Sequence, residues 1–268
     1  MHYRRTELLV TMTENHLLAE VRDKVLYITF NRPEKHNALS QQLLIDLKGI
    51  FESHSMDESI VAAVLTGSGR KTFAAGGDLR ELSKIRTESA AREMSNNSKL
   101  ALNSIRTFPL PVIAALNGNT FGGAAELAVA CDFRIADFHA KIGFVQGRLA
   151  LSTAWGGGAD LFQLVGRSNG LKLLLTGKML SSSEALEIGL VDQVVSVEGE
   201  LKQSVEDFLI PLRNQHAHVI RTFKELADAK RRGDSKNDLN ELETELFVSN
   251  WINDAHWEAA EKVLPTRK

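Results

Sequence analysis

The chain has 268 residues, of which 43% are hydrophobic and 25% charged, and it carries a formal net charge of −2. This composition is typical of globular proteins and lacks the basic excess of a nucleic-acid-binding domain. No apolar run reaches the length that spans a bilayer, and the single cysteine, Cys131, excludes a disulfide within the chain. We therefore expect a cytoplasmic protein without a nucleic-acid or membrane partner, with Cys131 as a small core residue.

The N-terminal part of the chain predicts a flexible lead-in followed by a β-hairpin. Residues 1–16 contain only short apolar stretches, whereas residues 17–33 alternate between apolar and polar side chains. The polar residues 22–24 interrupt that alternation and mark a turn. Ser40 precedes a run of apolar residues on one helical face, so we expect it to be the N-cap of a helix.

Two short apolar segments, residues 60–67 and 112–118, predict buried strands. Between them lie a polar loop over residues 68–77, a helix that starts at Asp78 and a longer helix over residues 88–106. Strands that alternate with helices are typical of α/β folds, and we expect stacked β-β-α units.

In the remainder of the chain, the apolar residues mostly have helical spacing. Ser181 and Glu184 have the spacing of a capping box, and we expect a late strand over residues 191–196. Three further helical segments are predicted near residues 198–213, 217–232 and 236–262.

Two glycine pairs mark candidate binding turns. Gly122 and Gly123 precede an apolar segment that carries one carboxylate, Glu126, and a second pair is formed by Gly76 and Gly77. A helix that begins at such a pair has backbone N–H groups without an acceptor and the positive end of a dipole. Because glycine has no side chain, a ligand oxygen can approach these N–H groups as in an oxyanion hole. Glu126 lies about one helical turn after Gly123, where it either stabilises the helix dipole or carries a proton for a bound ligand.

These motifs resemble the crotonase superfamily, the enoyl-CoA hydratase/isomerase family. The matching segments are residues 31–40, 73–79, 110–118, 122–136, 156–158 and 175–195. The resemblance implies a spiral of β-β-α units over residues 17–200, which binds an acyl-CoA thioester, and a helical C-terminal trimerisation region over residues 201–268. It implies a homotrimer or a dimer of trimers and no separate cofactor, because coenzyme A is part of the substrate. We also expect no metal site, because no His, Cys or Asp cluster has ligand spacing.

The resemblance implies roles for individual residues. It assigns the backbone N–H groups of Gly77 and Gly123 to the thioester oxygen, and Glu126 to proton transfer. The candidates for contact with the rest of the substrate are Ala75, Gly76, Asp78, Gly122, Arg32, Lys35, Phe223 and Lys224. Taken alone, each of the three basic residues in that set is otherwise expected to be a solvated surface charge. Trp155 either lines the acyl pocket or packs in the core.

The chain departs from the family pattern at Gln146. The hydratases of the family carry a second glutamate at this position, and an amide cannot exchange a proton near neutral pH. Losing one general acid or base typically costs about 10²–10⁴ in rate. Gln146 can still orient a water or a substrate carboxylate by hydrogen bonds. The segment 142–158 resembles the ethylmalonyl-CoA decarboxylase-like branch of the family, which likewise lacks this glutamate.

Several activities remain open at this point. With Glu126 as the single acid/base, the sequence favours decarboxylation of a malonyl-type acyl-CoA or isomerisation of a double bond. One alternative is an enoyl-CoA hydratase in which Gln146 only orients water. The alternative from another class is a non-catalytic, acyl-CoA-binding member of the fold.

Overall fold

The computed structural model describes residues 16–264. Except for His16, the flexible lead-in predicted over residues 1–16 lies outside the described residues.

A six-stranded sheet forms the centre of the molecule, with the strand order β1-β2-β3-β5-β7-β10. Its strands are β1 (Leu17–Arg22), β2 (Val25–Phe30), β3 (Ala62–Gly67), β5 (Val112–Leu116), β7 (Phe133–Ala136) and β10 (Gln193–Val194). The β1–β2 pair is antiparallel and the other pairs are parallel. The predicted hairpin is thus confirmed, and its turn contains Asp23 and Lys24, which both have positive φ.

A smaller four-stranded sheet runs beside the first, with the order β4-β6-β8-β9. Its strands are β4 (Thr72–Ala74), β6 (Asn119–Phe121), β8 (Lys141–Gly143) and β9 (Leu180–Ser181). The strands β4, β6 and β8 each follow a strand of the large sheet along the chain, and a helix follows each of them, which confirms the β-β-α units. The prediction of a polar loop over residues 68–77 was wrong in part, because the loop contains the buried strand β4.

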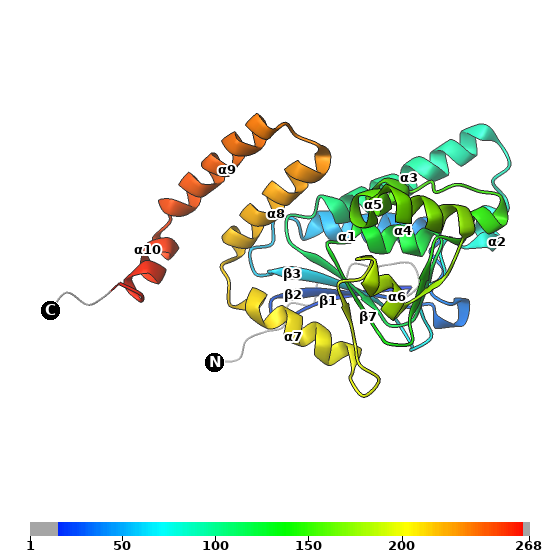
Figure 1. Ribbon diagram of the computed structural model, residues 1–268, viewed down its shortest axis with the longest axis horizontal. Coiled ribbons are helices and arrows are strands. Elements are labelled where there is room, and N and C mark those ends of the chain that lie inside the picture. Colours follow the sequence, from blue (N-terminus) through cyan, green and yellow to red (C-terminus); the bar gives the residue numbers. More distant parts are fainter. Residues whose placement is uncertain (1–15, 265–268) are drawn as a thin grey trace.

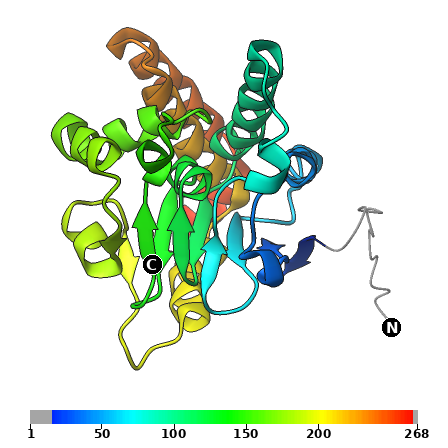
Figure 2. The same ribbon diagram turned by 90° about the vertical axis from the view of Figure 1, so that its right-hand side faces the viewer.

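The helices cover the large sheet on both faces. The helices before the C-terminal region are α1 (Gln41–Ser53), α2 (Leu79–Leu82), α3 (Glu88–Arg106), α4 (Gly123–Ala130), α5 (Gly157–Thr176) and α6 (Ser182–Glu187), with short 3₁₀ helices at Pro33–Lys35 and Val145–Leu149. Figures 1 and 2 show α1, α3, α4 and α5 on one side of the sheet and α7 (Leu201–Arg213) on the other. Each face of the sheet has its own apolar cluster, and successive residues of one strand point to opposite faces. In β3, Leu65 packs in the cluster under α1, α3, α4 and α5, whereas Val64 packs in the cluster under α7.

Side-chain caps fix where several helices begin, as the sequence predicts. The Ser40 hydroxyl accepts a hydrogen bond from the Leu43 N–H at 3.2 Å, and Asp78 caps α2 through the Arg80 N–H. Ser181 and Glu184 form the predicted capping box of α6. These caps satisfy N–H groups that the helices cannot satisfy internally.

The C-terminal helices are α8 (Ala217–Arg232), α9 (Lys236–Trp251) and α10 (Asp254–Glu261), of which α8 still packs against the body with buried residues. α9 and α10 extend away from the two sheets and bury no residue (Figure 1). The single helix predicted over residues 236–262 was wrong, because the chain breaks after α9 and Asn253 caps α10 by accepting the Ala255 N–H at 3.0 Å. Among the described residues, no helix combines the length and apolar character needed to cross a membrane.

Candidate active site

The structure brings the two glycine pairs together. Pairing between β4 and β6 places the turn after β4 beside the turn after β6. Gly76 has a φ of +92°, and a Cβ atom on it would lie 2.7 Å from the Phe121 carbonyl oxygen and 3.2 Å from the Gly123 nitrogen. Only glycine can therefore occupy position 76 without displacing the neighbouring turn.

The N–H groups of Gly77 and Gly123 are left for a ligand. Leu39 flanks Gly77 on both sides: its N–H donates to the Gly76 oxygen at 2.8 Å, and its oxygen accepts the Asp78 N–H at 3.0 Å. Within the part of the chain that the structure describes, neither the Gly77 N–H nor the Gly123 N–H donates to a protein acceptor. Gly123 is the first residue of α4, so its N–H also lies at the positive end of the helix dipole. Two such donors can hold an oxygen that develops negative charge.

Glu126 lies inside this site with its carboxylate surrounded by donors. It is only 2% exposed. Its Oε2 accepts the N–H groups of Trp155 at 2.9 Å and Gly157 at 3.0 Å. Its Oε1 accepts the Gln146 amide at 2.9 Å and, more weakly, the Ala154 N–H at 3.4 Å. Burial raises the pKa of the Glu126 carboxyl, although these four hydrogen bonds act in the opposite direction.

Gln146 stands where the family's hydratases carry their second glutamate, and its side chain lies beside Glu126 in the site. Its Nε2 donates to Glu126, which orients the amide. Its Oε1 is buried and has no hydrogen-bond partner among the described residues. A buried acceptor without a partner is unusual, and it indicates a position where a donor can bind.

Trp155 borders both candidate donors. Its side chain is 4% exposed, and a Cβ atom on Gly123 would lie 2.5 Å from its Cζ3. A Cβ atom on Gly77 would lie 3.5 Å from the Cζ2 of the same ring. The core interpretation of Trp155 is therefore confirmed, and its ring also lies beside the glycine turns, while its contact with an acyl chain stays a prediction.

Two of the basic residues proposed to meet coenzyme A are buried, which corrects their expected place on the surface. Arg32 is 4% exposed, pairs with Asp78 at 3.1 Å and donates to the Ala38 oxygen at 2.7 Å. Although burial alone would raise it, the hydrogen bonds from Arg32 and the start of α2 lower the pKa of Asp78. Lys224 is 6% exposed and pairs with Asp132 at 2.6 Å and Asp228 at 3.1 Å.

The remaining candidates lie toward solvent. Ala75, Lys35 and Phe223 are exposed, and 69% of Phe223 is accessible. They stay predictions as substrate contacts. Cys131 is a buried core residue as predicted, and burial raises the pKa of its thiol to about 12. Among the described residues, no group of His, Cys, Asp or Glu could hold a metal ion.

Sequence reasoning missed the residues that hold the loops around the site. Asn117 donates to the oxygens of Gly67 and Gly69, each at 2.8 Å, and Asn37 donates to the oxygen of Thr72 at 2.9 Å. Arg106 contacts the turn that holds Glu126, as described below. An asparagine directly after an apolar strand, as at position 117, is the signal that could have indicated the first of these.

Comparison with known proteins agrees with this geometry. The family model for enoyl-CoA hydratase/isomerase matches residues 20–264. The chain is 33% identical to crotonyl-CoA hydratase of Syntrophomonas wolfei over 217 residues, covering 81% of this chain and 83% of that protein. It is 39% identical to (E)-benzylidenesuccinyl-CoA hydratase of Thauera aromatica over 176 residues, covering 66% and 68%.

Solved structures agree as well. Pseudomonas aeruginosa DspI superposes with a TM-score of 0.88 at 30% identity, covering 98% of this chain and all of that chain (100%). An enoyl-CoA hydratase from Bacillus anthracis superposes with a TM-score of 0.87 at 29% identity, covering 92% and 95%. Fold and site thus define a protein of the crotonase superfamily. Within it, the chain belongs to the enoyl-CoA hydratase/isomerase family, whose members act on acyl-CoA thioesters.

Proposed function

We propose that this protein decarboxylates a malonyl-type acyl-CoA, a thioester with a carboxylate on its α-carbon. The proposal rests on the hydrogen bonding of the Glu126 carboxylate, whose two oxygens already accept four hydrogen bonds. Loss of CO₂ needs no base, because cleavage of the carbon–carbon bond itself supplies the electron pair of the enolate.

Reactions that start with removal of a proton suit this arrangement less well. To act as a base, Glu126 must give up at least one of its N–H donors, and three of these belong to the backbone of residues 154–157. Gln146 cannot replace it, because an amide does not take up a proton near neutral pH. Isomerisation and hydration both require such a base.

The proposed reaction uses the glycine turns directly. The bond between the α-carbon and the carboxylate breaks, CO₂ leaves, and the electron pair moves into the thioester. The N–H groups of Gly77 and Gly123 stabilise the negative enolate oxygen. The α-carbon then takes a proton from Glu126 or from water, which gives the shorter acyl-CoA. Water can supply this proton without any change at Glu126, whereas supply by Glu126 requires that the Gln146 amide rotate, so that its Oε1 accepts the hydrogen bond of the protonated carboxyl in place of the donation from Nε2.

Mass spectrometry of a small substrate panel tests this proposal. The panel contains methylmalonyl-CoA, ethylmalonyl-CoA, crotonyl-CoA and a 3-enoyl-CoA, with Glu126→Gln run beside the wild type. We expect loss of CO₂ from the first two without hydration of crotonyl-CoA. Fast hydration of crotonyl-CoA without CO₂ release would refute the proposal. Equal turnover of every substrate by both proteins would exclude catalysis by Glu126, and no turnover by either protein would favour a binding role for the fold.

Hydration is the second candidate, because relatives such as the Syntrophomonas wolfei protein are named hydratases. In that reaction the free Oε1 of Gln146 would accept a hydrogen bond from the attacking water. The panel separates the two candidates, since hydration adds the mass of water and decarboxylation removes that of CO₂.

A further inference from the structure

The turn formed by residues 154–157 is held from two sides. The N–H groups of Ala154, Trp155 and Gly157 point to Glu126, as described above. The turn's carbonyl oxygens are held by α3: the Ser95 hydroxyl donates to the Ala154 oxygen at 2.8 Å, and Arg106 Nη2 donates to the Trp155 oxygen at 3.4 Å. The position of α3 therefore fixes the groups that hold the Glu126 carboxylate.

Arg106, the last residue of α3, makes most of this connection. Its Nε and Nη2 donate to Oδ2 of Asp160 in the first turn of α5, at 2.9 and 2.6 Å, and its Nη1 donates to Asn103 at 2.7 Å. The guanidinium also packs on Gly156, where a Cβ atom would lie 3.0 Å from Nη2. With 11% of its side chain exposed, Arg106 is locked against the start of α5.

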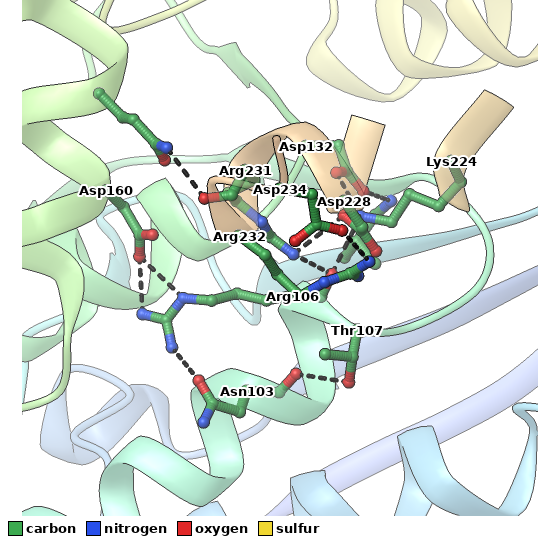
Figure 3. Close-up of polar contacts among 12 residues, drawn as sticks. Asn103, Arg106, Thr107, Asp132, Asp160, Lys224, Asp228, Arg231, Arg232 and Asp234 are labelled. Atoms are coloured by element: carbon green, nitrogen blue, oxygen red, sulfur yellow. Dashed lines mark hydrogen bonds and ion pairs between the residues drawn. The ribbon is translucent and has the colours of Figure 1, made fainter. Parts of the chain in front are cut away.

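The backbone of the same residue receives α8. The Arg106 carbonyl oxygen accepts the Lys224 ammonium at 3.1 Å and also the Arg231 guanidinium. Lys224 is in turn paired with Asp132 and Asp228, and Figure 3 shows these groups gathered around the end of α3. One residue thus connects α8, through its carbonyl, with the turn beside Glu126, through its side chain.

We infer that Arg106 is a positioning residue that couples the docking of α8 to the geometry of Glu126. Displacing α8 removes two donors from the Arg106 carbonyl and leaves Asp132 without its lysine. The end of α3 then loosens, and with it the turn that orients the carboxylate. Because α8 leads into α9 and α10, whatever α9 and α10 contact can act on the site by this route. The inference rests on the proposed function only in giving Glu126 a part in the reaction.

Three variants test the coupling. Arg106→Lys keeps the charge but loses the planar fork that spans Asp160 and Trp155. Lys224→Met weakens the docking of α8 at Arg106. Arg221→Met is the matched control, because Arg221 also docks α8, through the oxygens of Ser55 and Asp57 at 2.7 and 2.8 Å, without touching Arg106.

Two measurements are made on the full-length protein. The first is hydrogen exchange of the peptide that contains residues 154–157, without substrate. The second is kcat and KM for the acyl-CoA that the protein turns over. For Arg106→Lys and Lys224→Met we expect faster exchange and a kcat lowered about 10- to 100-fold, with KM changed less than about threefold. For Arg221→Met we expect both measurements within about twofold of the wild type.

Unchanged exchange and kcat in Arg106→Lys would overturn the inference. So would an equal effect of Arg221→Met and Lys224→Met, because the loss would then not depend on the contact between α8 and Arg106. If Lys224→Met does not fold, Arg231→Met removes the other donor to the same carbonyl and is judged by the same criteria. Since the exchange experiment needs no substrate, it can succeed even if the proposed decarboxylation fails.

Discussion

Glu126 is a buried carboxylate whose protonation differs between the folded and unfolded chain. Its pKa is raised on folding, mainly by burial, from an ordinary value of 4.5. Between that value and the raised pKa, the folded protein binds more protons than the unfolded chain. The free energy of unfolding must therefore fall as pH rises through this window.

Glu126→Gln removes this dependence. We expect the wild type to lose stability relative to the variant as the pH rises above 4.5 and up to the folded-state pKa. The measurement is denaturant unfolding of both proteins across that pH range. A constant difference between them would show that Glu126 titrates alike in both states.

Restoring a carboxylate at position 146 should change the reaction. We expect Gln146→Glu to gain hydration of crotonyl-CoA by about 10²-fold, because the site would then hold two groups able to move protons. The new carboxyl would lie close to Glu126, because the Gln146 Nε2 of the wild type is 2.9 Å from Glu126 Oε1. Two carboxyl groups at this distance should raise the pKa of one of them. Gln146→Met, which removes the amide without adding charge, should show no such gain. Hydration is followed by loss of absorbance of the enoyl thioester, and no increase in the glutamate variant would contradict the role assigned to position 146.

Trp155 should limit the acyl group because its ring borders both glycine turns. We expect Trp155→Ala to bind octanoyl-CoA about 10-fold more tightly relative to acetyl-CoA than the wild type does, since more methylene groups can be buried. Calorimetric titration with these unreactive thioesters measures the ratio. Met56→Ala, at an exposed position outside every surface assigned a role, serves as the control. The same ratio in all three proteins would place the acyl chain elsewhere.

At the scale of elements, the caps and the long amphipathic helices could be predicted from the sequence, whereas the short strands of the smaller sheet could not. Ser40 and Ser181 carry a local signal, because the cap and the N–H it accepts lie within three residues. A strand of three residues, such as β4, is too short to show a period. The candidate site was also predicted only in part, because the family resemblance pointed to Gly77, Gly123 and Glu126 but not to their supporting contacts. The backbone donors of residues 154–157 have no side-chain signature, and the partners of Lys224 lie up to 118 residues away in sequence.

The contact between the loop after β2 and the start of α2 gives a test of Arg32 at this scale. Arg32 and Asp78 join the start of α2 to the turn after β2, and both are shielded from solvent. We expect Arg32→Met to lower the free energy of unfolding by about 3 kcal/mol, because it leaves Asp78 without its partner. KM for the acyl-CoA should change less than about threefold if Arg32 is structural. A large rise in KM with little loss of stability would instead support the predicted contact with coenzyme A.

At the scale of the whole molecule, a cluster of exposed aromatic side chains lies on the extended C-terminal helices. Phe247, Trp251 and Trp257 are each exposed by 46% or more and contact one another through their rings. A patch of this kind is typical of a protein–protein interface. The homotrimer or dimer of trimers expected from the sequence remains a prediction, and this surface is its best candidate.

Light scattering coupled to gel filtration tests the assembly. We expect a trimer or hexamer for the wild type and a smaller species for Trp251→Asp, because a charge in a buried apolar contact is costly. Glu243→Gln, on the same helix and also exposed, should leave the mass unchanged. A monomeric wild type would contradict the prediction.

The extension of α9 and α10 also affects how well an unassembled chain resists proteolysis. These helices bury none of their residues against the body, so opening them costs an isolated chain little free energy while both sheets stay folded. A protease should therefore trim a lone chain from its C-terminal end before it attacks the core. Copies that cover these helices in an assembly would resist trimming. A shortened C-terminus would then distinguish chains that had not assembled from those that had.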